Sequence, residues 1–313
     1  MVRRLRFSAK GLEEVRRHSW RDEYKELLYA ALRLKPDQLI VDVGCGTGAF
    51  SRILAEKLDW KWGGRIIGID RDSKLLAAAR RLASASGLSP RLEFMEGDAK
   101  NIQLPDEYAD RVVCQALLWL MTENDRANVL KEMIRICKRG GLVAAVEGSI
   151  DTSVGWFPDD PRLTELYAKS TSAMLKGYKK VYGYDRSIGY KIPSLFKELG
   201  LSQVRLDGIT DARLRSDDRF PSDHSRGVLK LWYLQYPKQL LSKVDKIAGE
   251  RGKKAFIEKN ERVLTAGGMA WKEIVELNRL KVAYYSRVTS QRAMGKDATV
   301  EAGIHFVTTG IKA

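Results

Sequence analysis

Three aspartates, Asp42, Asp70 and Asp98, stand in or at the end of short apolar runs and could bind one ligand together. The runs span residues 39–43, 64–70 and 92–98. Such a run is typical of a buried parallel strand. Because ligands of open α/β sheets bind outside the carboxyl ends of the strands, we expect the three carboxylates to face a ligand that is cationic or donates hydrogen bonds.

A glycine-rich turn follows the first run, where the sequence is DVGCGTGAF. Gly44, Gly46 and Gly48 would let the backbone approach a ligand closely, and Cys45 lies between the first two. The turn has no lysine, which excludes a phosphate-binding P-loop. The dinucleotide pattern G-x-G-x-x-G/A fits Gly44, Gly46 and Ala49, so an NAD-binding turn remains an alternative.

The carboxylate of Asp42, two residues before Gly44, separates these alternatives. A pyrophosphate gains nothing from a nearby anion, whereas a ligand with an ammonium and a sulfonium group does. The D-x-G-x-G-x-G pattern resembles motif I of the class I methyltransferases that use S-adenosylmethionine (SAM), and more narrowly the methyltransferase domain of ubiquinone and menaquinone biosynthesis. The resemblance implies a SAM site formed by the following residues: Asp42, Gly44, Cys45, Gly46 and Gly48.

The second and third runs add residues to this predicted site. Asp70, followed by Arg71, ends the second run, where a carboxylate can accept hydrogen bonds from ribose hydroxyls of either NAD or SAM. For Asp98 and Ala99 the resemblance implies contacts with the adenine amino group and a ring nitrogen. An NAD site does not predict this second acid. The alternative for each acid alone is a solvated loop carboxylate.

Two polar residues are candidates for positions near the transferred methyl group. Gln115 ends a predicted fourth strand that resembles motif IV, although the Asn-Pro-Pro-Tyr signature and the histidines of the quinone enzymes are absent. A purely structural glutamine is the alternative. Glu147 follows the predicted strand 142–146 and could orient the substrate or act as a base. Its alternative role is to cap a loop. His224 is a further candidate base.

Composition restricts the class of protein. The chain has 313 residues, of which 44% are hydrophobic, and no stretch of 18 apolar residues, so we expect no transmembrane segment. The basic N-terminus lacks the apolar core of a signal peptide. The three cysteines have no C-x-x-C spacing, which predicts neither a disulfide framework nor a metal site. A cytoplasmic protein is therefore predicted.

The net charge of +15 favours contact with polyanions such as RNA, anionic lipid headgroups or an acidic substrate. The alternative is a thermophile-like surface, because the basic residues are spread along the chain. Nucleic-acid binding therefore stays open without being favoured.

The pattern of elements, together with the resemblance, predicts an α/β fold: a Rossmann-like, seven-stranded, doubly wound sheet with its last strand antiparallel and with helical lid insertions. The predicted parts are N-terminal helices (1–35), a SAM-binding core (36–150), a substrate-cap insertion (151–190), a core continuation (191–209), a helical lid insertion (210–302) and a final core strand (303–313). An insertion as long as the second is usually functional. A dimerisation surface is its alternative, so a homodimer stays open.

The predicted activity is methyl transfer from SAM to a small organic acceptor in a lidded pocket. One alternative is a methyltransferase that acts on RNA or another macromolecule. Another is an NAD-binding protein or a nucleotide-binding protein without catalysis.

Overall fold

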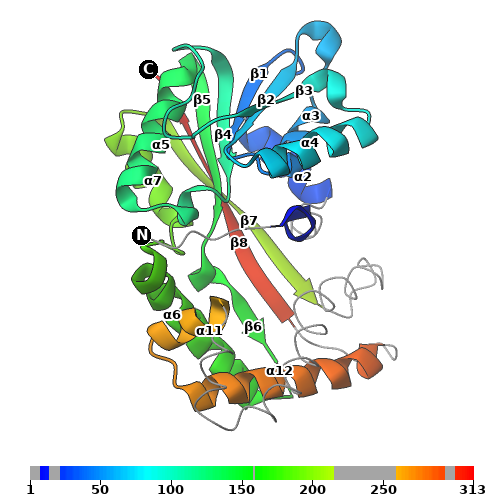
Figure 1. The fold of residues 1–313 in the computed structure, drawn as a ribbon, viewed down its shortest axis with the longest axis vertical. Coiled ribbons are helices and arrows are strands. Elements are labelled where there is room, and N and C mark those ends of the chain that lie inside the picture. The colour runs from blue at the N-terminus through cyan, green and yellow to red at the C-terminus, as the bar shows by residue number, and fades with distance from the viewer. Residues whose placement is uncertain (1–7, 14–21, 158, 215–258, 293–299) are drawn as a thin grey trace. The chain divides into compact units, whose positions relative to one another are not determined.

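The computed structural model describes residues 8–13, 22–157, 159–214, 259–292 and 300–313 (Figure 1). The chain forms two compact units. The first comprises residues 1–149, 187–209 and 304–313, and the second comprises residues 150–186 and 210–303.

The first unit is built on a mixed sheet in the strand order β3-β2-β1-β4-β5-β8, with β7 on the far side of β8. The strands are β1 (Leu39–Val43), β2 (Arg65–Asp70), β3 (Leu92–Glu96), β4 (Ala109–Gln115), β5 (Cys137–Gly148), β7 (Ser202–Leu214) and β8 (Val300–Ile311). Strands β1 to β5 are parallel, and β8 pairs with β5 in the antiparallel sense. The predicted seven-stranded sheet with an antiparallel last strand is thereby confirmed.

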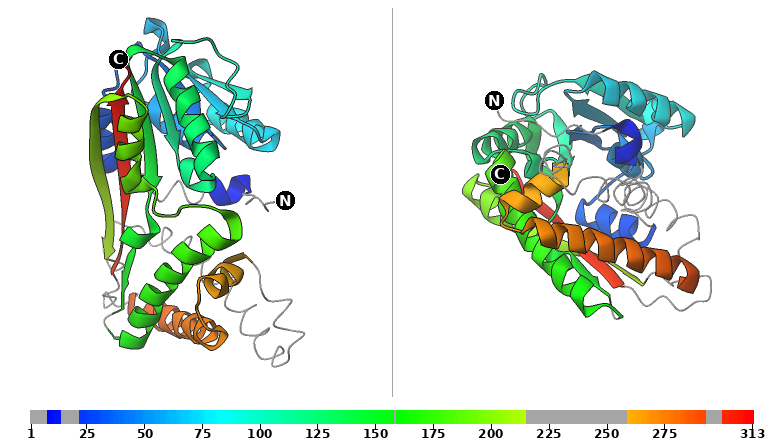
Figure 2. Two further views of the ribbon diagram at one scale, coloured as in Figure 1. Left: turned by 90° about the vertical axis from the view of Figure 1, so that its left-hand side faces the viewer. Right: turned by 60° about the horizontal axis from the view of Figure 1, so that its bottom comes forward.

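Helices cover both faces of this sheet, as the left panel of Figure 2 shows edge-on. They are α2 (Asp22–Ala31), α3 (Ala49–Ala55), α4 (Ser73–Ala85), α5 (Glu123–Ile136) and α7 (Ile192–Glu198). Successive residues of β1 face opposite layers: Ile40 packs in the cluster of α2 and α3, and Val41 packs in the cluster of α5 and α7. Burial on both faces explains why the strands appear in the sequence as apolar runs.

Short 3-10 helices span Trp60–Trp62, Ser89–Arg91, Leu118–Leu120, Ile150–Thr152 and Gly189–Lys191. Side-chain caps fix the starts of the longer helices of the first unit. The Asp72 carboxylate accepts hydrogen bonds from two N–H groups of the first turn of α4, and the Thr122 hydroxyl accepts one from α5.

The helical pattern before Gly140 predicts a helix over residues 124–139, and the end of that helix is wrong by three residues. Periodicity extends the helix to Arg139, but α5 ends at Ile136 because Cys137 is extended (φ −75°, ψ 136°) and pairs with Ala109. Gly140 then takes a positive φ of 71° and its N–H donates to the Lys312 carbonyl (2.8 Å). Tertiary pairing at the edge of β4 therefore overrides local helix propensity.

The second unit has its own apolar core. It contains β6 (Val154–Trp156), α6 (Pro161–Tyr182), α11 (Lys259–Ala266) and α12 (Trp271–Arg292). Phe157 and Tyr284 meet edge to face with ring centroids 5.0 Å apart at the centre of this core. The sequence Asp160-Pro161 predicts the start of a helix, and the structure confirms it, since Asp160 caps the Leu163 N–H (2.9 Å) and Pro161 occupies the first turn.

Much of the predicted helical lid, including His224, lies outside the described residues. Within the described part of the chain, no helix is both long enough and apolar enough to cross a membrane.

Candidate functional site

Strand register brings the predicted site residues to one edge of the sheet. Val43, the last residue of β1, pairs with Ile69 of β2 and with Cys114 of β4. Asp70 and Gln115 are each one residue further along their strands, level with the start of the glycine turn. The carboxyl ends of β1, β2 and β4 therefore form one surface, which is where open α/β sheets bind ligands (Figure 1).

The glycine turn has the backbone that its sequence requires. Gly44, Gly46 and Gly48 all have positive φ angles, between 56° and 74°. The N–H of Gly44 donates to the Ile69 carbonyl at 2.7 Å, which fastens the turn to β2. A Cβ atom on Gly44 would lie 2.6 Å from Cδ1 of Leu117 in the loop after β4. The positive φ therefore disfavours any side chain at Gly44, and the Leu117 side chain would also have to move to admit one.

Asp70 connects the glycine turn to the end of β2. Its Oδ2 accepts the N–H of Gly46 and its Oδ1 accepts the N–H of Asp72, both at 2.9 Å. The side chain is half-buried, and each carboxylate oxygen keeps a second lone pair for a ligand hydroxyl. Arg71, the next residue, is exposed. Asp70 is thus an acceptor of fixed orientation at the mouth of the turn.

Asp42 lies beneath the turn and is 1% exposed. Its Oδ2 accepts a hydrogen bond of 2.6 Å from the hydroxyl of Ser51, which stands on α3. Ser51 was not among the residues predicted from the sequence; the available signal was a serine in the first turn of a predicted helix, nine residues after an acid. This bond orients the carboxylate from below.

Asp98 and Ala99 follow β3 in a tight turn. The exposed Asp98 carboxylate accepts the N–H of Lys100 at 2.9 Å, and Ala99 is half-buried. The N–H of Gly97 donates to the Asp70 carbonyl at 3.0 Å, so this turn is tied to the end of β2. The backbone brings Asp98 to the same edge as Asp70, and its contact with an adenine stays a prediction.

Gln115 and Glu147 end neighbouring strands and differ in their bonding. Gln115 is 5% exposed, and among the described residues nothing donates a hydrogen bond to its Oε1. Glu147 is 1% exposed, and its Oε1 accepts the N–H groups of Leu117 (2.9 Å) and Leu118 (2.7 Å). Glu147 therefore holds the loop after β4, the same loop that touches Gly44. The geometry favours the loop-capping alternative for Glu147.

A segment before α2 also reaches the glycine turn. Residues 9–13 are helical, and Leu12 lies 3.5 Å from the position of a Cβ on Gly46. Arg52 of α3 donates to the Thr47 carbonyl (2.8 Å) and to the Glu13 carboxylate (2.6 Å). The resemblance implies that a helix within residues 10–34 lies against the cofactor site and that Trp20 or Tyr24 reaches the ligand, with ordinary packing as the alternative. Trp20 lies outside the described residues, and Glu13 and Arg52 were not identified from the sequence.

All three cysteines are buried, and each thiol has a raised pKa. Burial is the main cause for each, and for Cys45 the charges of Asp42 and Asp70 add to it. Burial raises the pKa of Cys137 to about 11, so only about one such thiol in a thousand is ionised at pH 8. We expect the folded protein to show no rapid reaction with a thiol reagent such as DTNB at pH 8. In guanidinium chloride three equivalents should react at once, and a fast equivalent before unfolding would contradict the burial.

Comparisons with known proteins all indicate similarity to methyltransferases. Residues 40–141 match the family model described as "Methyltransferase domain". The chain is 31% identical over 148 residues to a phosphatidylethanolamine N-methyltransferase of Cereibacter sphaeroides, covering 40% of this chain and 69% of the relative. It is 27% identical to a demethylmenaquinone methyltransferase of Bacillus cereus, covering 62% of this chain and 81% of the relative.

Solved structures share the fold at low sequence identity. A phosphoethanolamine N-methyltransferase 2 of Haemonchus contortus, in complex with phosphomonomethylethanolamine and S-adenosylhomocysteine, gives a TM-score of 0.51 at 14% identity. The match covers 98% of this chain and 58% of that one. A methyltransferase structure from Bacillus halodurans gives 0.50 at 16% identity, covering 93% and 99% of the two chains.

Proposed function

Since the chain belongs to the class I methyltransferases that use S-adenosylmethionine, we propose that it transfers the methyl group of SAM to a small organic acceptor. The observation that carries this proposal is the shared edge: the glycine turn, Asp70 and Gln115 stand level at the carboxyl ends of β1, β2 and β4.

The polar groups at this edge complement the chemistry of SAM. SAM carries an ammonium group, a sulfonium group and two ribose hydroxyls, which are cations and hydrogen-bond donors. The edge offers acceptors: the oriented carboxylate of Asp70, the buried carboxylate of Asp42 and the Oε1 atom of Gln115. We assign Asp70 to the ribose, Asp42 to the cationic end of the ligand and Asp98 with Ala99 to the adenine. The glycine turn lets the backbone approach the ligand closely.

Catalysis in this proposal rests mainly on positioning. SAM supplies an electrophilic methyl group on a neutral leaving group, so the chain's own residues need only hold an acceptor atom in line with the methyl–sulfur bond. Gln115 is the polar side chain that we place beside the methyl group. Glu147 keeps the loop at Leu117 and Leu118 in the conformation that leaves room for the glycine turn. A general base is required only if the acceptor loses a proton.

The class of acceptor is proposed from the relatives. Those reported above are named for a phospholipid headgroup and for a demethylmenaquinone, both small polar or aromatic groups attached to lipid chains. We propose that residues 151–190 and 210–302 form the lid that encloses such an acceptor. In support, residues 150–186 and the described part of 210–303 form one compact unit with a separate core.

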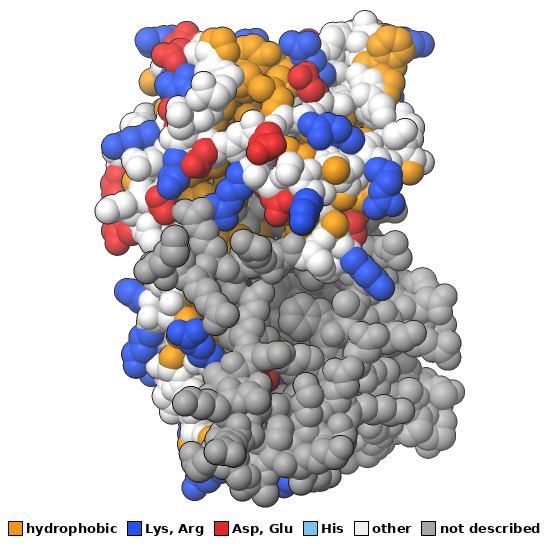
Figure 3. Space-filling view, in the orientation of Figure 1, with side chains coloured by type: hydrophobic (Ala, Val, Ile, Leu, Met, Phe, Trp, Pro, Cys, Tyr) orange, Lys and Arg blue, Asp and Glu red, His pale blue; other side chains and the backbone are white. Residues whose placement is uncertain are grey.

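An RNA substrate is the alternative suggested by the net charge. On the face drawn in Figure 3, basic and acidic side chains are interspersed over the described part and no continuous basic track is present. This favours the small acceptor, because RNA binding without a recognition module relies on a concentrated basic surface.

Calorimetry with SAM, S-adenosylhomocysteine and NAD tests the cofactor. We expect binding of the first two and none of NAD. Incubation with SAM labelled in its methyl group then tests the acceptor, with phosphatidylethanolamine, demethylmenaquinone and total RNA as separate candidates. Binding of NAD without SAM would refute the proposal at its first step. Label in RNA alone would refute the small acceptor and leave the cofactor assignment intact.

A further inference from the structure

Two exposed tryptophans of the first unit lie just before the amino end of β2, at the end of the sheet opposite the glycine turn. Trp60 and Trp62 occupy the 3-10 helix before β2 and are 51% and 74% exposed. A large aromatic side chain exposed to this degree loses the benefit of burial, and a pair of them within one turn indicates a surface that contacts something else.

The turn that carries them is structured. The Asp59 carboxylate caps the N–H of Lys61 at 2.9 Å, and the N–H of Gly63 donates to the Trp60 carbonyl at 3.1 Å. The N–H of Asp59 also donates to the Pro36 carbonyl at 2.8 Å. A Cβ on Gly64 would lie 1.9 Å from that carbonyl oxygen, so only glycine permits this contact. The two indoles are therefore presented by a fixed backbone beside residues 33–38.

Exposed cations adjoin this turn: Arg33, Lys35, Lys61 and Arg65. None of the four forms an ion pair with any residue that the structure describes. The neighbouring lysines of the same layer behave differently, since Lys25 pairs with Glu56 and Lys57 pairs with Glu26. The cations beside the tryptophans are thus available to a partner of opposite charge.

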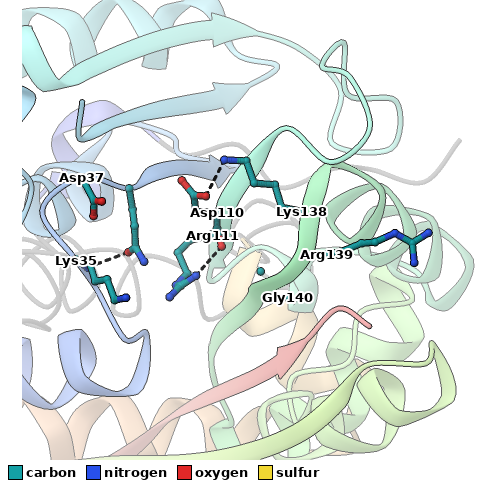
Figure 4. Close-up of a pocket in the computed structure, with 9 residues that line it drawn as sticks. Lys35, Asp37, Asp110, Arg111, Lys138, Arg139 and Gly140 are labelled. Carbon is teal, nitrogen blue, oxygen red and sulfur yellow. Dashed lines mark hydrogen bonds and ion pairs between the residues drawn. The ribbon is translucent and has the colours of Figure 1, made fainter. Parts of the chain in front are cut away.

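A pocket of about 360 Å³ continues the same surface and is lined by Lys35, Asp37, Gln38, Asp110, Arg111, Lys138, Arg139, Gly140 and Gly141 (Figure 4). The guanidinium of Arg111 donates to the carbonyls of Leu32 and Arg33, and Lys138 pairs with Asp110 at 2.7 Å. In Figure 4 the side chain of Arg139 points away from these residues. It forms an ion pair with Glu107 at 3.0 Å. Among the described residues, the Lys35 ammonium is the cation of this lining that forms neither an ion pair nor a side-chain hydrogen bond, whereas Arg111 donates to carbonyls and Lys138 and Arg139 form ion pairs.

We propose that this surface, made by Trp60 and Trp62 with Arg33, Lys35, Lys61 and Arg65, docks onto an anionic phospholipid bilayer. The indoles would lie at the boundary between headgroups and acyl chains, where amphipathic rings are stabilised. The four cations would lie against lipid phosphates, each adding to the attraction of an anionic surface. The chain needs no membrane-spanning helix for such contact.

The geometry favours a bilayer over RNA as the partner. Proteins that bind single strands stack bases on aromatic side chains along a basic groove. Here the aromatic residues protrude from the tip of a turn, with nothing within 4 Å of the position of a Cβ on the neighbouring Gly63. A protruding tip can insert into the headgroup region of a bilayer. It does not form the groove that a single strand of RNA would occupy. This inference does not depend on the methyl acceptor.

Flotation of the full chain with vesicles tests the inference. We expect binding to vesicles of equimolar phosphatidylglycerol and phosphatidylcholine, weakened by salt, and little binding to phosphatidylcholine alone. The double variant Trp60→Ala/Trp62→Ala and the double variant Arg33→Glu/Lys35→Glu should each bind the anionic vesicles roughly tenfold more weakly. Both alter exposed side chains, so thermal unfolding should be nearly unchanged.

Two control variants separate the surface from general charge and hydrophobicity. Lys179→Glu/Lys180→Glu makes the same change of charge on exposed residues of α6, and Leu206→Ala removes a 44% exposed apolar side chain from β7. Both should bind vesicles as the parent does. Equal loss in the charge control, or no binding of the parent, would overturn the inference. So would RNA binding that the tryptophan variant loses while vesicle binding persists.

Discussion

Replacing Asp70 with alanine is expected to weaken SAM binding by about 100-fold. The carboxylate is proposed to accept both ribose hydroxyls, and hydrogen bonds to a charged group contribute about 1.5–3 kcal/mol each. The variant also loses the acceptor for the N–H groups of Gly46 and Asp72, so the glycine turn becomes less well ordered. Calorimetric titration with SAM measures the change.

The control for Asp70 is Glu93→Ala, which removes an exposed carboxylate from β3 and should leave SAM affinity unchanged. Asp70→Asn keeps one carbonyl oxygen and should give an intermediate loss. Thermal unfolding of each variant shows whether the fold persists. SAM affinity equal to that of the parent in the alanine variant would remove Asp70 from the site, while the strand register would still stand.

The second large effect is expected at Glu147. Alanine at this position leaves the buried N–H of Leu118 and that of Leu117 without their acceptor, at about 1–3 kcal/mol each. We expect the free energy of unfolding to fall by about 3–5 kcal/mol in total. Chemical denaturation followed by circular dichroism measures it. Glu198→Ala, which removes an exposed acid from α7, is the matched control and should change stability little.

Glu147→Gln separates the two roles considered for this residue. Glutamine keeps a carbonyl oxygen for both N–H groups but cannot take up a proton as a base. We expect the glutamine variant to be folded, with kcat within about threefold of the parent, because the geometry assigns the side chain to the loop. A folded glutamine variant with kcat reduced by a factor of about a hundred or more would establish the general base instead.

The sequence predicted the structure best where a local conformation or environment requires a particular type of residue. Three glycines predicted a turn whose backbone can approach a ligand closely, and all three have the positive φ angles that glycine tolerates best. Apolar runs predicted the parallel strands because both faces of the sheet are buried. The Asp160–Pro161 pair predicted the start of α6 from cap chemistry alone.

The sequence was least informative where a partner lies far away in the chain. Nothing near Glu147 reveals that it binds the N–H groups of Leu117 and Leu118, thirty residues earlier. The ion pair between Glu13 and Arg52 and the early end of α5 at Ile136 likewise depend on tertiary contacts. Hydrophobic periodicity predicts which face of a helix or strand is buried, but it does not predict which atoms a side chain contacts.

The position of β8 sets an order for folding during synthesis. Residues 305–311 pair with β5, and β8 is the strand partner of β7 within the described part of the chain, so this pairing forms only after β8 has left the ribosome. Residues 300–302 of the same strand pair with β6. Until then the nascent chain exposes an unpaired edge on β5, which is a hazard for aggregation. Completion of the sheet is therefore a late step of folding that must compete with self-association.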